Sequence, residues 1–229
     1  MTDAGAAVGV DACKAGWVAV VLREGELAEA LVLGHVGELV AAVGDAGTIA
    51  IDIPIGLVDT GTRDADRLVR ASLGVRRNSL FVTPVRAALE AASYAEALEI
   101  SRRIANVGIS AQAFALRSKI LEVERWIPAA PCRVAEVHPE LCFTEMTGAP
   151  MAAGKRSWQG MVDRRAALAS EGIVLDAVDR IVGARVPVDD LLDAAAAAWT
   201  ARRLLAGVAR CLPDPPQTGG GGTSIAIWV

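Results

Sequence analysis

A nearly all-apolar run at residues 48–54, TIAIDIP, sets the strongest limit on how this chain can fold. A strand of that composition is typical of a sheet that is covered on both faces. It follows three short β-rich runs at 6–12, 16–22 and 27–34, and a stretch with helical apolar spacing at 36–47. The order β-β-β-α-β predicts an antiparallel meander. Its first strand should lie parallel to the run at 48–54, because a helical crossover joins parallel neighbours.

The remainder of the chain continues this α/β pattern with one interruption. Helical patterns dominate residues 57–130, which we interpret as a helical insertion, with the clearest helices at 62–74, 93–106 and 110–125. The sheet resumes at CRVAEVH, and further helices are expected at 139–146, 157–171 and 188–210. The Pro/Gly stretch 213–222 is predicted to be an irregular linker before a last edge strand at 223–229. We therefore expect residues 1–229 to form a single domain with a mixed sheet of five or six strands.

Composition limits the classes of protein to consider. The chain has 229 residues and a formal net charge of -4, with no run of about 18 apolar residues and no basic start followed by an apolar segment. These features favour a cytoplasmic protein that does not enter a membrane. The four cysteines form no CxxC pair, so a zinc ribbon is not indicated. The oligomeric state, monomer or homodimer, stays open.

Four acids fall where chemistry is expected. Asp11 closes the strand VGVD and Asp52 closes the strand IAID, so parallel pairing would bring both carboxylates to the same edge of the sheet. Asp190 and Asp193 are three residues apart and share one face of a helix. The alanine run that follows them lets this helix approach the sheet closely.

Carboxylates gathered in this way repel one another and need a cation to offset them. Because all the ligands would be oxygens, Mg²⁺ or Mn²⁺ is favoured over zinc. Each acid also has a structural explanation that stays open. Asp11 would cap a turn, Asp52 would end a strand, Asp190 would favour a helix start, and Asp193 would be a solvated acid in the second turn.

The segments GVDACKAGWVAV, AIDIPIGL, EVHPEL and DDLLDAAAAAWTA occur in this order, with the helical insertion after the second. Over roughly residues 8–229 the chain resembles the family catalogued as domain of unknown function 429, a predicted nuclease family with an RNase H-like fold. The D-x-x-D-A of Asp190 to Ala194 is also similar to the last-helix motif of RuvC-type Holliday-junction resolvases, whose acids bind two divalent metals. The resemblance implies that Asp11, Asp52, Asp190 and Asp193 form a metal-binding quartet for phosphodiester hydrolysis.

Actin-like kinases share this fold, but they carry a Gly-Thr or Gly-Ser phosphate loop after the first-strand Asp. Here Asp11 is followed by Ala-Cys-Lys, which disfavours a kinase.

The segment EVHPE adds two candidates for catalysis. Glu136 and His138 are two residues apart on a predicted strand and would share a face at the same sheet edge. His138 is then a candidate proton carrier or outer metal ligand. The alternative is a histidine that is hydrogen-bonded at a strand-to-helix corner.

Basic residues of the insertion are candidates for substrate binding. Arg63, Arg67 and Arg70 are spaced i, i+4, i+7 and would line one face of a helix. The guanidinium group suits phosphate oxygens, so these residues would hold a nucleic-acid backbone over the metal site. The alternative is a solvated face with local ion pairs. The full set of candidates is Arg63, Arg67, Arg70, Arg77, Arg86 and Lys119.

These features predict a metal-dependent nuclease that uses two Mg²⁺ or Mn²⁺ ions to hydrolyse DNA or RNA. Two alternatives stay open. One is a protein of the same fold that binds or hydrolyses a nucleotide or small phosphoester, and the other is a catalytically silent interaction module.

Overall fold

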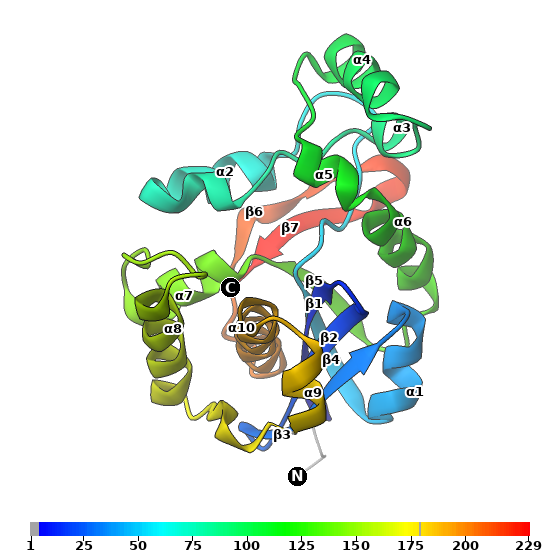
Figure 1. Cartoon of the computed structure of the whole chain (residues 1–229). Coiled ribbons are helices and arrows are strands. Elements are labelled where there is room, and N and C mark those ends of the chain that lie inside the picture. The colour runs from blue at the N-terminus through cyan, green and yellow to red at the C-terminus, as the bar shows by residue number, and fades with distance from the viewer. Residues whose placement is uncertain (1–4, 179) are drawn as a thin grey trace.

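The computed structural model describes residues 5–178 and 180–229, which form an α/β fold on one seven-stranded mixed sheet. The strands lie in the order β3-β2-β1-β4-β5-β7-β6 across the sheet (Figure 1). The predicted α/β class and mixed sheet are confirmed, but the sheet has seven strands rather than the predicted five or six, because residues 211–218 add a strand where a linker was expected. In chain order the strands are β1 (Ala6–Cys13), β2 (Gly16–Arg23), β3 (Glu26–Leu33), β4 (Ala46–Ile51), β5 (Arg133–Val137), β6 (Cys211–Thr218) and β7 (Ser224–Trp228).

Helices connect the strands and cover the sheet. The α-helices are α1 (Leu39–Val43), α2 (Asp64–Ser72), α3 (Arg86–Leu89), α4 (Tyr94–Ala105), α5 (Ala111–Ala115), α6 (Arg117–Trp126), α7 (Pro139–Thr147), α8 (Trp158–Ser170), α9 (Arg180–Arg185) and α10 (Val188–Leu205). Short 3₁₀ helices are η1 (Val36–Glu38), η2 (Gly74–Ser79), η3 (Ile127–Ala129), η4 (Leu175–Ala177) and η5 (Gly220–Gly222). Among the described residues, no helix combines the length and apolar character needed to cross a membrane.

The N-terminal part of the sheet has the predicted β-β-β-α-β order. Strands β1, β2 and β3 form an antiparallel meander, and β4 pairs parallel with β1 after the short helix α1. Glu24 and Gly25 join β2 to β3 with φ values of 53° and 89°. Positive φ at both positions is what a two-residue hairpin turn of type I′ requires.

The C-terminal part of the sheet differs from the prediction at 213–222. Residues 211–218 form strand β6, which lies at the edge of the sheet, whereas β7 lies between β5 and β6. The linker prediction is therefore wrong for this segment, and the last strand is not an edge strand. The register of β6 with β7 shifts between Leu212 and Gln217, and the prolines fall within that interval. Proline is tolerated at an edge strand or bulge, where its missing N–H costs no sheet hydrogen bond.

The stretch predicted as a helical insertion, 57–130, contains helices α2 to α6 and connects β4 to β5 (Figure 1). The predicted helix 110–125 is divided into α5 and α6 at Leu116. The Arg86 N–H donates to the Val58 carbonyl at 3.1 Å, which closes the loop around α2. The insertion thus stands at the carboxyl end of β4, beside the predicted site.

Successive residues of β1 and β4 point alternately into two separate cores. Ala7 and Ala50 belong to a core that includes the alanines of α10, whereas Val8 and Ile49 belong to a core with η1, α1 and α6. On the α10 side, Gly9 lets helix and strand backbones touch. A Cβ at this position would lie 1.9 Å from the Ala198 nitrogen and 2.1 Å from the Ala194 carbonyl oxygen. The close approach of α10 to the sheet therefore depends on a glycine in the strand as well as on the alanines of the helix.

Candidate metal centre

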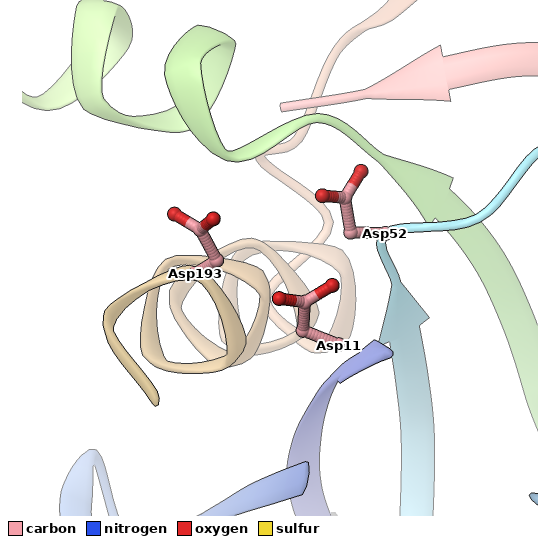
Figure 2. Close-up of side chains that lie close together, drawn as sticks. All are labelled: Asp11, Asp52 and Asp193. Carbon is pink, nitrogen blue, oxygen red and sulfur yellow. The ribbon is translucent and has the colours of Figure 1, made fainter. Parts of the chain in front are cut away.

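Three carboxylates meet where β1 and β4 end. Asp11 lies near the end of β1, Asp52 directly follows β4, and Asp193 lies in the second turn of α10. One oxygen of each lies within 4.8 Å of an oxygen of the other two. Figure 2 shows the three side chains pointing into a common space. The structure therefore brings together three of the four acids that were predicted as metal ligands, and we call them the acid trio.

Strand pairing makes Asp11 and Asp52 neighbours. The Asp52 N–H donates to the Val10 carbonyl at 2.9 Å, which continues the parallel ladder of β1 and β4 by one residue. Since side chains alternate between faces along a strand, these acids point to the same side as Gly9 and Ala50, two residues before them. That side is the one covered by α10.

Burial and mutual repulsion disfavour the ionised form of the trio. Asp11 and Asp193 are 7% and 2% exposed. Burial, followed by the charges of Asp52 and Asp193, raises the pKa of Asp11 well above its ordinary value. Burial also raises the pKa of Asp193 to about 7, against the lowering effect of Lys155. A cation placed among these oxygens would reverse both tendencies, because it favours the ionised form.

The trio also has an oxygen available for a ligand. Oδ1 of Asp193 is buried and has no hydrogen-bond partner in the described part of the chain. A buried carboxylate oxygen without a partner costs free energy unless something binds it. Carboxylate oxygens are the ligands that Mg²⁺ and Mn²⁺ prefer, so the residues present fit a divalent cation of that class.

Asp190, the fourth predicted ligand, does not join the trio. It lies three residues before Asp193, a displacement of about 4.5 Å along the axis of α10. Its side chain is half-buried and lines the same cavity. Burial and the charge of Asp189 raise the pKa of Asp190. The predicted quartet is therefore a trio with an additional acid nearer the rim.

Lys155 reaches the trio from the loop between α7 and α8, and no sequence pattern identified it. Its Nζ lies 2.5 Å from Oδ2 of Asp193 and 3.9 Å from Oδ2 of Asp189. Burial alone would lower the pKa of this ammonium group, but Asp193, Asp11 and Asp52 raise it above its ordinary value. Lys155 is therefore held as a cation against one oxygen of the trio.

His138 and Glu136 lie at the same sheet edge but contact different partners. His138 is the N-cap of α7, with Nε2 3.0 Å from the Ser79 hydroxyl and Nδ1 3.7 Å from Oδ1 of Asp52. Glu136 is the register partner of Ile51, whose side chain packs in the core away from α10. Glu136 also lines the cavity, but its carboxylate accepts from the Ile55 N–H at 2.7 Å and binds Arg63 rather than a member of the trio. Of these two residues, only His138 lies next to an acid of the trio.

Arg63 is the partner of Glu136, which corrects its predicted role. Its side chain is fully buried, and Nη2 donates to both carboxylate oxygens of Glu136 at 2.6–2.7 Å. Asp66 also faces this guanidinium, with Oδ1 3.4 Å from Nε. Burial raises the pKa of Glu136 to about 7, while Arg63 lowers it and Asp66 raises it. Arg63 precedes α2 and points into the protein, so it is not part of a phosphate-binding face.

The other predicted basic residues do not line the cavity either. Arg67 is exposed and pairs with Asp64, and Arg77 is exposed. The other three make contacts of their own: Arg70 donates to the Leu80 carbonyl, Arg86 pairs with Glu124, and Lys119 lies over the Trp17 ring. The predicted single arginine face is therefore divided between exposed and structurally engaged side chains.

A cavity of about 500 Å³ opens on the trio. One wall is formed by residues of the insertion, namely Arg76, Ser79, Phe81 and Gln112, and another is formed by the acids of α10. The cationic side chains that line it are Arg76, Lys155 and Arg156, of which sequence patterns singled out none as a ligand contact. The cavity therefore combines an acidic floor with basic groups at its walls, which suits a cation together with an anionic ligand.

Comparisons with known proteins identify a family. No match was found among curated proteins or among solved structures. A family model described as "Protein of unknown function (DUF429)" matches residues 9–218. The matched range contains every member of the acid trio and also Lys155. Because the match spans most of the chain, this protein belongs to the DUF429 family.

Proposed function

We propose that this protein hydrolyses phosphodiester bonds of nucleic acid with a divalent metal ion, Mg²⁺ or Mn²⁺, held by the acid trio. The observation that carries the proposal is the meeting of three carboxylate oxygens within 4.8 Å in a cavity, one of the acids having a buried oxygen without a partner. An acid cluster of this kind is costly to the fold unless a cation offsets it.

The residues around the trio have distinct roles in this proposal. Asp11, Asp52 and Asp193 would hold the metal, and a bound divalent ion would supply positive charge for the phosphate and lower the pKa of a water molecule. His138 lies beside Asp52, because Ser79 contacts the far nitrogen of its ring and leaves the near one facing the carboxylate at 3.7 Å. Hydrolysis then adds a water oxygen to phosphorus and breaks the bond to the leaving oxygen. Of the two protons of that water, one ends on the leaving oxygen, through solvent, and the other is released to solvent.

The assignment to nucleic acid rests on the arrangement of the fold. An antiparallel meander followed by parallel strands β4 and β5, with acids at the ends of β1 and β4 and on a late helix, resembles the RNase H-like arrangement of nucleases. Since one fold hosts many activities, the substrate has to be tested directly.

A small phosphoester or nucleotide is the second candidate substrate. A volume of about 500 Å³ is typical of pockets for small molecules. Arg63, Arg70 and Arg86, which were expected to bind a nucleic-acid backbone, are engaged within the protein. Both observations favour a substrate that enters the cavity as a single nucleotide unit.

A substrate panel separates these candidates. Single- and double-stranded DNA, single-stranded RNA, a branched DNA junction and bis-p-nitrophenyl phosphate would each be incubated with Mg²⁺, Mn²⁺ or EDTA. We expect metal-dependent cleavage that is lost in Asp193→Asn and retained in Asp214→Asn, a change of an exposed acid outside the cavity. Cleavage of the small diester alone would favour the second candidate. Absence of both cleavage and metal binding would contradict the proposal and favour an interaction module.

A further inference from the structure

The position of Lys155 bears on how many ions the trio can hold. Its ammonium group contacts Oδ2 of Asp193 at 2.5 Å, while Oδ1 of the same carboxylate is buried without a partner. One oxygen of Asp193 is thus already bound to a positive charge, and the other is free to bind a metal. A second ion that bridged to Oδ2 would have to displace Lys155.

The loop that carries Lys155 is fixed from two sides, so the contact is built into the fold. The buried Arg164 of α8 donates to the carbonyls of Ala153 at 3.1 Å and Gly160 at 2.9 Å. It also pairs with Glu140 of α7 at 2.5 Å. These contacts fasten the residues just before Lys155 to two helices of the core.

The insertion holds the same loop from the other side. Arg76 donates through Nε to the Met151 carbonyl at 2.7 Å and through Nη2 to the Ala152 carbonyl. In addition, a Cβ at Gly160 would lie 2.0 Å from the carbonyl oxygen of Gly154, so α8 and the loop pack backbone against backbone. Such a supported loop positions a side chain more accurately than a free surface loop.

Charge balance within the trio and Lys155 agrees with a single ion, since Asp189, the other acid next to Lys155, is itself paired with Arg156 at 3.4 Å. The trio contributes three negative charges and Lys155 one positive charge, which leaves two for one divalent cation to neutralise. Two divalent ions would give this group a net charge of +2 within a largely buried site.

We propose that Lys155 takes the place of a second metal ion, so that the trio binds one divalent cation and the Lys155 ammonium group contacts the substrate phosphate. This inference rests on the proposed function for its substrate, and it differs from the two ions that the resemblance to RuvC-type resolvases implies. Lys155 keeps its proton throughout and acts by its charge, which stabilises the negative charge that develops on the phosphate oxygens.

Calorimetric titration of the metal-free protein with MnCl₂ alone tests the number of ions. We expect one Mn²⁺ per chain for the wild type and for Lys155→Arg, which keeps the charge. For Lys155→Met we expect a second Mn²⁺ and a first Kd that is lower by about tenfold or more, because Oδ2 is released and one positive charge is lost. The control is Lys14→Met, a change of an exposed lysine outside the cavity, which should match the wild type.

Several results would overturn the inference. Two Mn²⁺ per wild-type chain would do so without affecting the proposed function, and this measurement does not depend on a variant that folds. Identical titrations of Lys155→Met and the wild type would do the same. No binding of Mn²⁺ by the wild type would contradict the inference and the proposed function together.

Hydrolysis of bis-p-nitrophenyl phosphate in Mn²⁺ tests the contact with phosphate. We expect kcat/KM to fall by about a hundredfold in Lys155→Met, although this variant binds more metal, and to fall less in Lys155→Arg. A Lys155→Met protein with undiminished kcat/KM would contradict a role of Lys155 at the phosphate.

Discussion

Asp52 is the member of the trio whose carboxylate has the fewest stabilising contacts with other protein groups. Within the described ranges no hydrogen bond to its carboxylate is found, and the His138 ring lies 3.7 Å from one of its oxygens. Asp11 and Asp193 lie on its other side. The carboxylate of Asp52 is therefore positioned by the backbone at the end of β4 and not by hydrogen bonds, as is expected of a metal ligand.

Asp52→Asn separates a ligand from a structural acid. The amide keeps the shape of the side chain and removes one charge from a repelling group, so the melting temperature in EDTA should be equal to that of the wild type or higher. Metal-dependent hydrolysis should fall by about a hundredfold or more. Melting curves and cleavage assays on the same preparations check both. A variant that melts lower yet remains fully active would remove Asp52 from the site.

The raised pKa of Glu136 predicts how the stability of the protein changes with pH. Its pKa in the folded protein is about 7, against an ordinary value of 4.5, because it is buried beside Asp66 as well as Arg63. With Glu136 protonated, Arg63 and Asp66 balance one another. Since the folded state binds the proton more tightly, the stability that Glu136 contributes is complete below pH 4.5 and is lost as the pH rises through about 7.

Glu136→Gln mimics the protonated form and tests this directly. Urea unfolding between pH 5.5 and 8 should show a variant close to the wild type at the acid end and more stable at the alkaline end. The difference between the two proteins should change by roughly 1 kcal/mol per pH unit at most. A difference that is independent of pH would mean that Glu136 is ionised throughout, as a simple ion-pair partner of Arg63.

Helix α10 and strand β1 set the spacing of the trio. Their backbones touch at Gly9, where a Cβ would overlap atoms of Ala194 and Ala198. Because Asp193 directly precedes Ala194, the separation of helix and strand also sets the distance from Asp193 to Asp11. Packing and metal binding should therefore change together.

Gly9→Ala is expected to lower the free energy of unfolding by about 1–3 kcal/mol, because the helix must move away from the strand. It should also weaken Mn²⁺ binding, since Asp193 moves with the helix. Gly183→Ala in α9 is a matched control: no atom lies within 4 Å of its added Cβ, and alanine favours a helix interior. Unchanged stability and Mn²⁺ affinity in Gly9→Ala would show that α10 does not depend on this contact.

The three acids of the site could be predicted from the sequence, whereas Lys155 could not. Asp11 and Asp52 were predicted because each acid ends an apolar strand in the sequence, and a helical crossover makes those two strands parallel. Asp193 was found because the alanines after it indicate a buried helix face. Lys155 was not predictable, since it lies in a loop whose position depends on Arg164 and Arg76. Contacts between distant segments leave no periodic pattern in a sequence.

Arg63 and β6 were predicted incorrectly for a related reason. The spacing of the arginines at 63, 67 and 70 suggested one helical face, but the helix begins only at Asp64 and buried acids attract Arg63 inward. For β6, the proline-rich composition indicated a linker. The neighbouring strand β7 supplies the pairing that the segment alone does not favour. In both cases a tertiary partner determined the outcome.

In the whole molecule, the exposed arginines of the insertion lie outside the cavity. Arg67 of α2 and Arg77 of η2 are the members of the predicted set that are exposed to solvent. Arg77 stands between Arg76 and Asn78, which line the cavity, so we expect the flanking phosphates of a nucleic-acid strand at the trio to lie near this part of the insertion. The double change Arg67→Glu, Arg77→Glu should then weaken binding to all sequences and reduce the salt slope by about two, since each phosphate contact contributes about 0.9. Binding isotherms at several salt concentrations measure this, and an unchanged slope would place the polymer elsewhere.

Anomalous diffraction from crystals grown with Mn²⁺ tests the metal centre most directly, because the signal identifies the ion and its ligands in one experiment. We expect one anomalous peak bounded by oxygens of Asp11, Asp52 and Asp193, with Lys155 still on the other oxygen of Asp193. Crystals of Asp52→Asn should show a weaker peak at the same place. A cavity without a peak at millimolar Mn²⁺, or a peak bound by other residues, would contradict the assignment of the trio as a metal site.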